Sequence, residues 1–315
     1  MRPGCRCDTC PMKSRSALAR LQQATTLFLL ACACAWLAWH WRSSHLLALA
    51  GFLAIAMSYS LFLAVEFVAL KFAGRRECAP QPTWLELAGA WLRETAVAPR
   101  VFCWRQPFRW RAVPDMLESP TGQPAKRGVV LIHGFVCNRG FWNPWMLRLR
   151  ALGHPFVAVN LEPLFGSIDC YVPIIEEAVE RITRATGLAP VLVCHSMGGL
   201  AARAWLRART AHQRVHHVIT IASPHHGTWL AQFSHVENGR QMKFDGPWIR
   251  ALEQCAASAR PDQFTCWYSN CDNNVFPVST ATLPGADNRL VRGAAHVQLG
   301  FHQRVMDESL AKIGQ

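Results

Sequence analysis

Two long apolar runs lie near the N-terminus of the chain. The first, residues 24–39, carries no charge, and the second, residues 46–70, carries only Glu66. A bilayer core needs about 20 apolar residues, so the second run is long enough to cross it, and the first is long enough if it extends through Trp41. Tryptophans cluster at that end of the first run, as in the aromatic belt of a membrane helix. The pattern predicts a transmembrane hairpin of two helices over residues 24–72.

Basic residues flank this hairpin on its outer sides. Residues 1–23 form a basic tail, Arg42 lies in a tight turn at the tip, and further basic residues follow the second run. Lys and Arg favour the cytoplasmic side, so we expect both ends of the hairpin, and the body that follows it, on the cytoplasmic side of a bacterial-type inner membrane. In the alternative interpretation the first run is a cleaved signal peptide, and LLAC (29–32) loosely resembles a lipoprotein cleavage site. The flanking basic residues are Arg2, Arg6, Lys13, Arg15, Arg20, Lys71, Arg75 and Arg76.

Strands that are apolar throughout alternate with helical patterns from Gly128 onward. Such strands are buried on both faces, which is typical of a parallel sheet covered by helices. The sequence therefore predicts an α/β fold, with a mostly parallel sheet and helices on both faces, over residues 128–315. The expected strands are 128–134, 156–161, 190–195, 215–224, 264–270 and 288–293, and the expected helices are 140–152, 173–186 and 199–210.

Residues 75–127 connect the hairpin to this domain. Thr83 and Glu86 have the spacing of a helix capping box, and apolar residues after Thr83 fall on one helical face. This helix is expected to lie either on the membrane surface or on the α/β domain. Aromatic residues alternate with basic ones over residues 100–113, which predicts edge strands, and residues 118–127 predict a turn or linker. The apolar face comprises Trp84, Leu85, Ala88, Trp91 and Leu92.

The composition is 51% hydrophobic and the net charge is +13. No basic and aromatic module with a nucleic-acid signature is found, so an anionic membrane surface is the simpler partner for the positive charge. The 13 cysteines are scattered and odd in number, which favours a reducing compartment over a disulfide framework. Cys5, Cys7 and Cys10 lack a second ligand cluster that would complete a tetrahedral metal site. We therefore expect no cofactor and no metal.

The segment 191–206, VLVCHSMGGLAARAWL, reads as a strand that turns into a helix at Ser196. A serine nucleophile needs an exposed, fixed position and a base, and a strand-to-helix elbow supplies the position. Residues two positions before and two after the serine must be small, so that strand and helix can approach each other. Gly198 meets this requirement, whereas Cys194 stands where many hydrolases have glycine. The elbow is therefore expected to form with some packing cost at Cys194.

An earlier loop, His133-Gly134-Phe135, follows the first apolar strand. A loop in this position can offer a backbone N–H group to the oxyanion that develops during acyl transfer. The residue after the nucleophile offers the second N–H group. Phe135 and Met197 are therefore the predicted oxyanion donors.

Three segments in this order, LIHGF, CHSMGG and IASPHHGT, resemble the bacterial triacylglycerol lipases and related esterases of the α/β-hydrolase superfamily. The resemblance covers residues 127–305 and not the hairpin. The family places the nucleophile first, then the acid, then the base. The resemblance thus implies a catalytic triad of Ser196, Asp272 and His296, with Asp272 beginning a D-x-x-V-x-P pattern. Asp287 is the competing acid, but it precedes the last strand instead of following the strand before it.

The same resemblance implies roles for several further residues. His195, His225 and Gly227 belong to its motifs and are expected to support the site rather than act as bases. Residues 228–263 are expected to form a cap or lid over an acyl pocket. Gln298 stands where bacterial lipases often have an acidic calcium ligand, which argues against a calcium ion.

The sequence predicts a membrane-anchored serine hydrolase that cleaves carboxylic esters, with a lipid-like ester as substrate. An acyltransferase or an acyl-thioesterase would use the same triad and differ only in acceptor and pocket. A non-enzymatic alternative is a degenerate hydrolase fold that serves as a membrane interaction module. The presence of all three triad residues argues against that alternative.

Overall fold

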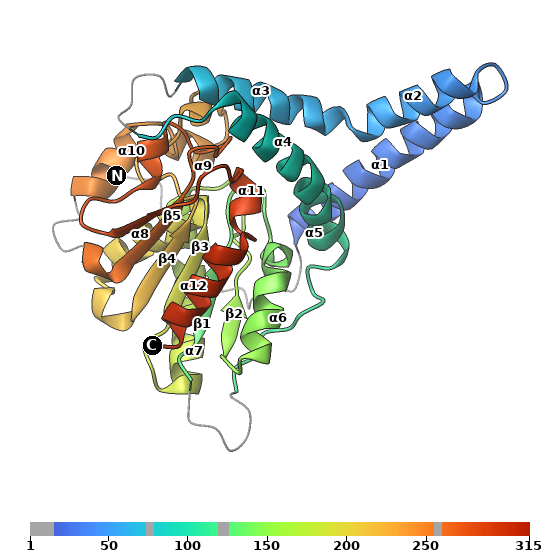
Figure 1. Cartoon of the computed structure of the whole chain (residues 1–315). Coiled ribbons are helices and arrows are strands. Elements are labelled where there is room, and N and C mark those ends of the chain that lie inside the picture. The colour runs from blue at the N-terminus through green and yellow to red at the C-terminus, as the bar shows by residue number, and fades with distance from the viewer. Residues whose placement is uncertain (1–15, 74–78, 119–125, 255–259) are drawn as a thin grey trace, which may run out of the picture.

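The computed structural model describes residues 16–73, 79–118, 126–254 and 260–315. Its centre is a six-stranded sheet in which all neighbouring strands are parallel, in the order β2-β1-β3-β4-β5-β6 (Figure 1). The parallel sheet predicted from the apolar strands is confirmed. Its strands are β1 (Val129–Ile132), β2 (Phe156–Ala158), β3 (Val191–His195), β4 (His217–Ile221), β5 (Phe264–Tyr268) and β6 (Asp287–Leu290).

Helices cover both faces of this sheet. Successive strand residues point to opposite faces: Leu192 packs in one core with α7 and α8, and Val193 packs in the other with α6 and α12. Burial on both faces explains why the strands are apolar throughout. The helices of this α/β body (residues 128–315) are α6 (Asn143–Ala151), α7 (Val172–Thr186), α8 (Met197–Arg209), α9 (Glu237–Gln241), α10 (Pro247–Gln254), α11 (His296–Leu299) and α12 (Gln303–Ile313).

The N-terminal apolar region forms the helices α1 (Ala17–His40), α2 (His45–Ala56) and α3 (Ser58–Ala73). α1 begins earlier than predicted, because Ser16 accepts a hydrogen bond from the Ala19 N–H group and Glu162 accepts one from the Ala17 N–H group. Residues 17–23, predicted as basic tail, are therefore the first turns of a helix attached to the α/β body. Residues 1–15 of that tail, including the three clustered cysteines, lie outside the described residues.

The second apolar run is not one straight helix. α2 and α3 meet at a bend of 52°. By length and composition, α1 can cross a membrane. A second crossing segment is present only if α2 and α3 count together as one span. The predicted two-span hairpin is therefore supported only in its first helix. α1 and α2 lie side by side and project from the body, whereas α3 runs back over it (Figure 1). α3 buries Phe67 and Leu70 against the body and leaves Phe62 and Val65 exposed.

α4 (Trp84–Pro99) begins with the capping box that Thr83 and Glu86 predict. It packs on the α/β body and on α3, with Leu87, Ala90, Glu94 and Ala98 buried. Trp84, Leu85 and Leu92 of the predicted apolar face are exposed. The helix therefore contacts the α/β body through a different stripe, which includes the buried carboxylate of Glu94, and contact of the apolar face with a membrane surface stays a prediction.

The predicted edge strands at residues 100–113 are also wrong. α4 continues into a π-helical turn, Arg100–Arg105, and the short helix α5 (Gln106–Phe108). The aromatic residues that suggested alternation also have helical spacing: Trp104 and Phe108 are four residues apart, and their ring centroids lie 5.9 Å from each other. Part of the predicted linker, residues 119–125, lies outside the described residues.

The segment predicted as a cap, residues 228–263, contains a 3-10 turn (Trp229–Phe233), α9 and α10. Residues 255–259 of this segment lie outside the described part of the chain. Leu230, Ala231 and Met242 line a cavity above the carboxyl ends of the strands. The segment thus forms one wall of the site described below.

Candidate active site

Ser196 stands at the turn between β3 and α8. Its backbone has φ 53° and ψ −128°, a conformation that L-residues other than glycine rarely adopt. Its N–H group donates to the Ile221 carbonyl at 2.9 Å, which fixes the turn to β4. A Cβ on Gly198 would lie 2.4 Å from the Ile132 carbonyl oxygen, so this position requires glycine for the close approach of helix and strand. The geometry is that of a strained nucleophile elbow.

Cys194 lies beneath the elbow and is fully buried. It pairs with Ile132 on one side and Thr220 on the other, and its side chain packs in the core with Leu200. Burial raises the pKa of the thiol, so it stays protonated. Cys194 therefore fills space where a glycine would leave it empty, and the small size of the thiol is compatible with the turn.

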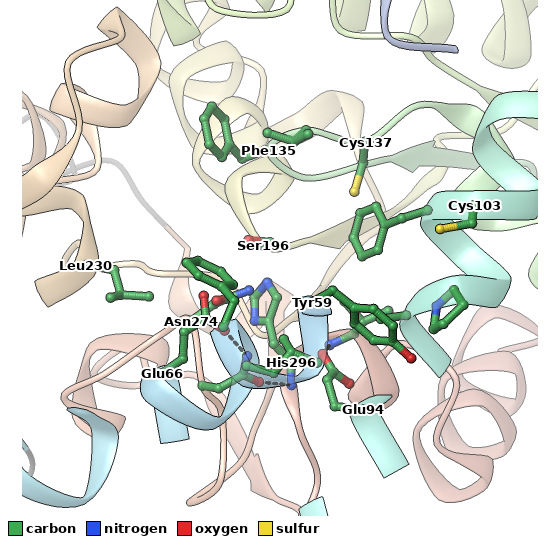
Figure 2. A pocket seen from close by; sticks show the side chains of 18 of the residues that line it. Tyr59, Glu66, Glu94, Cys103, Phe135, Cys137, Ser196, Leu230, Asn274 and His296 are labelled. Carbon is green, nitrogen blue, oxygen red and sulfur yellow. Dashed lines mark hydrogen bonds between the residues drawn. The ribbon is translucent and has the colours of Figure 1, made fainter. Parts of the chain in front are cut away.

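Asp272 and His296 meet beside Ser196. The loop after β5 carries Asp272 and the start of α11 carries His296, whose Nδ1 lies 2.9 Å and 3.1 Å from the two carboxylate oxygens. Asp272 also accepts hydrogen bonds from the N–H groups of Asn274 and Val275 at 2.9 Å and 2.8 Å. A carboxylate at Nδ1 sets the tautomer in which Nε2 is free to accept a proton. Ser196 and His296 line one cavity, and Figure 2 shows the His296 ring extending toward Ser196.

Asp287, the competing acid, lies elsewhere. It starts β6, where its carboxylate pairs with Arg289 at 2.7 Å and accepts from Thr265 at 3.3 Å. The structure therefore brings Asp272, and not Asp287, to the imidazole of His296.

The protonation of His296 depends on its buried neighbours. Burial alone would lower the pKa of His296. The charge and hydrogen bond of Asp272, together with the charge of Glu94, raise the pKa and outweigh burial, so the pKa is raised. Burial lowers the pKa of His133 to about 4 and that of His195 well below its usual range. Of these three histidines, His296 is the one with a raised pKa, which suits it to accept a proton.

His133 and His195 have supporting contacts. His133 Nδ1 lies 2.9 Å from the Gly134 carbonyl, and its Nε2 accepts from the Leu161 N–H group at 3.0 Å, which ties the loop after β1 to the loop after β2. His195 Nε2 lies 3.2 Å from the His296 carbonyl. Both rings therefore hold loops of the site in place.

The predicted oxyanion residues lie next to the nucleophile. A Cβ on Gly134 would lie 2.8 Å from Ser196 Cβ, so the loop that carries Phe135 packs directly on the elbow. Met197 is the first residue of α8, where backbone N–H groups have no acceptor within the helix. Phe135 and Ser196 line the same cavity (Figure 2).

The IASPHHGT block forms a buried support behind the elbow. His225 is fully buried, its Nε2 lies 3.0 Å from Thr220 Oγ1, and its carbonyl accepts from Arg203 at 2.7 Å. Gly227 has φ +84°, a left-handed conformation suited to glycine. The hydrogen bonds of His225 to Thr220 and Arg203 thus hold the block to β4 and α8 and do not involve Asp272 or His296.

Sequence reasoning missed a set of buried polar side chains from the N-terminal helices. Glu94 of α4 is 1% exposed, and its two oxygens accept from the Val297 and Gln298 N–H groups at 2.8 Å and 2.9 Å. These donors are in the first turn of α11, directly after His296. Burial raises the pKa of Glu94 to about 7. The sequence contains one sign of this contact: Glu94 is a single carboxylate on an otherwise apolar face of the helix, and a buried charged group there requires a partner.

Glu66 of α3 acts on the same loop through Asn273. Asn273 Nδ2 donates to Glu66 at 2.6 Å, and Asn273 Oδ1 accepts from the His296 N–H group at 3.2 Å. The N-terminal helices thus hold both the start of α11 and the loop that carries Asp272.

Among the described residues, no group of three or more His, Cys, Asp or Glu side chains could hold a metal ion. Gln298, at the position expected for a calcium ligand, accepts from the Ala295 N–H group at 3.1 Å within its own turn. The chemistry that this arrangement can perform is nucleophilic attack by a serine with a histidine base.

A six-stranded parallel sheet with a serine elbow after β3 and an acid and a histidine after later strands defines the α/β-hydrolase class. The sequence matches the alpha/beta hydrolase family over residues 129–305, more than half of the chain, and the protein belongs to this family. None of the curated proteins matches the sequence.

Solved lipase structures are similar in fold. The lipase BlEst2 of Bacillus licheniformis in its mature form has 17% identity and a TM-score of 0.55, with 62% of this chain and 96% of that chain covered. Lipase B of Aspergillus fumigatus has 14% identity and a TM-score of 0.55, with 96% of this chain and 82% of that chain covered. At these identities the similarity concerns the fold alone.

Proposed function

We propose that the protein is a membrane-anchored serine hydrolase that cleaves carboxylic esters. The observation that carries the proposal is the pair of Asp272 and His296 next to a strained Ser196, in a cavity whose walls are mainly apolar. The lipase similarity in fold supports the ester as substrate class.

In the proposed reaction His296 Nε2 takes the proton of Ser196 Oγ as this oxygen attacks the ester carbonyl carbon. The N–H groups of Phe135 and Met197 stabilise the negative charge on the carbonyl oxygen. His296 then gives the proton to the leaving alcohol, and Asp272 stabilises the charged imidazole in between. Water, deprotonated by the same histidine, hydrolyses the acyl-enzyme and releases the acid.

The membrane part of the proposal rests on α1 and on the bent pair α2–α3. α1 is long and apolar enough to cross a bilayer, and the bent pair is a second candidate. Positive charge on the outer flanks of this region favours the cytoplasmic side for the α/β body.

The test is hydrolysis of p-nitrophenyl butyrate by the full chain in detergent. The wild type should show turnover, and Ser196→Ala should lower kcat by more than about 10⁴-fold, because the acyl-enzyme cannot form. Undiminished turnover by Ser196→Ala would exclude the proposed nucleophile.

A further inference from the structure

The cavity above Ser196 is built in large part by the N-terminal helices. It has a volume of about 900 Å³, at the upper end of the range for small-molecule sites. α1, α2, α3 and α4 all contribute lining residues. Figure 2 shows Tyr59 and Glu66 of α3 and Glu94 of α4 around the cavity, together with Leu230 of the cap segment and Phe135. The family match begins only at residue 129, so this wall belongs to a part of the chain outside the matched hydrolase domain.

The polar lining residues of the cavity come mainly from α3, α4 and the α/β body, and few come from α1 and α2. Ser196, His296 and Asn273 line the end next to the sheet. The wall contributed by α1 and α2 is apolar apart from one threonine. Its side chains are Leu29, Leu30, Ala33, Phe52, Ile55 and Ala56. A ligand that fits has one polar, reactive end and a long apolar remainder.

The apolar wall continues into the exposed apolar surface of the same helices. Leu30 is 52% exposed and Phe62 is 66% exposed, although both line the cavity. Contiguous large apolar side chains at such exposure are typical of a surface that contacts a membrane. α1 is the segment with the length and composition of a membrane span. The cavity therefore extends from the nucleophile to the surface that a bilayer would cover.

We propose that this cavity binds the acyl chain of a membrane-resident ester, which passes from the bilayer along α1–α2 and under α3–α4 to Ser196. The inference rests on the proposed function and adds the substrate class and its path. The helices of the anchor are then part of the substrate site, and they select long acyl chains. Soluble short-chain esters reach Ser196 without using this wall.

Two alanines on α2 provide a matched pair of variants. Ala56 lines the cavity, whereas Ala54 is exposed on the same helix and is not among the lining residues. Ala56→Trp places an indole in the outer part of the cavity, and Ala54→Trp adds the same bulk outside it. Each full-length variant is reconstituted in phosphatidylcholine vesicles and assayed with p-nitrophenyl butyrate and with p-nitrophenyl palmitate dissolved in the same vesicles.

The measured quantity is the ratio of kcat/KM for palmitate to that for butyrate, which is independent of the folded fraction. Ala56→Trp should lower this ratio about tenfold or more, and Ala54→Trp should change it less than twofold. An unchanged ratio in Ala56→Trp, or an equal fall in both variants, overturns the inference. If Ala56→Trp does not fold, Ala56→Leu gives the same comparison with a smaller side chain.

A second readout separates the inference from the proposed function. A short-chain fluorophosphonate should label Ser196 at the same rate in both variants and in the wild type. Absence of labelling in the wild type contradicts the proposed function itself. If Ala56→Trp is labelled like the wild type and its palmitate-to-butyrate ratio of kcat/KM is also unchanged, only the acyl-chain path is contradicted.

Discussion

Replacement of Glu94 by alanine tests whether the N-terminal helices position His296, the proposed base. The carboxylate of Glu94 accepts two hydrogen bonds, at 2.8 Å and 2.9 Å, from the N–H groups of Val297 and Gln298, and it is 1% exposed. Glu94→Ala leaves both donors buried without this acceptor. His296, the residue before them, keeps its own N–H bond to Asn273.

The expected cost follows from the two lost bonds. A buried donor without a partner costs about 1–3 kcal/mol, so the free energy of unfolding should fall by about 2–6 kcal/mol. Such a loss is large against a typical total of about 5–15 kcal/mol. If α11 shifts by about 1 Å, kcat should fall about 100-fold. Glu94→Gln keeps one acceptor oxygen and should lie between the wild type and Glu94→Ala in both quantities.

The pH profile gives a readout that a purely structural role would not change. His296 must be neutral to accept the serine proton. Glu94, whose own pKa is raised to about 7, contributes to the raised pKa of His296 when it is ionised. Loss of this charge in Glu94→Gln lowers the pKa of His296, so the acid limb of kcat/KM should move to lower pH. The assay is p-nitrophenyl butyrate hydrolysis from pH 5 to pH 9, with thermal unfolding measured alongside.

Glu86→Ala is the matched control on the same helix. It removes the capping box of α4 and the 3.1 Å pair with Arg292, and it does not touch α11. We expect a stability loss of about 1 kcal/mol and an unshifted acid limb. The reasoning is refuted if Glu94→Ala keeps wild-type kcat, if Glu94→Gln has the acid limb of the wild type, or if Glu86→Ala shifts the acid limb as far as Glu94→Gln does.

Three further predictions concern the acid, the thiol and the topology. Asp272→Asn should lower kcat about 10⁴-fold and Asp287→Asn should not, as measured by butyrate hydrolysis; the reverse order would reassign the acid. Cys194→Gly should retain activity while losing about 1–3 kcal/mol in denaturant unfolding, since it leaves a cavity in the core, and an inactive but folded variant would indicate a chemical role for the thiol. Alkaline phosphatase fused after Gln315 should be inactive and a fluorescent protein there should be bright, whereas an active phosphatase would place the α/β body outside the cytoplasm.

The sheet could be predicted from the sequence because its strands are buried on both faces. Leu192 and Val193 point to opposite cores, so β3 reads as an uninterrupted apolar run between turn residues. The elbow was also predictable, since Ser196 stands between that run and Gly198. These signals are local: each depends on residues within a few positions of one another.

The contacts between the N-terminal helices and the site were not predictable in this way. Glu94 lies more than two hundred residues before the N–H groups that it accepts from, and no periodicity records such a pairing. The same carboxylate lies on the stripe of α4 that contacts the α/β body, a stripe that the spacing of the large apolar residues did not indicate. The 52° bend between α2 and α3 falls beside Ser58 and Ser60, which interrupt the apolar run too little to predict a bend.

The central claim is that Ser196 is the nucleophile of this protein. The most direct measurement is intact and peptide mass spectrometry after reaction of the full chain with a fluorophosphonate, for the wild type and Ser196→Ala side by side. The account predicts one adduct per chain in the wild type, on the peptide that contains Ser196, and none in Ser196→Ala. An adduct on another residue, or equal labelling of both proteins, would contradict it.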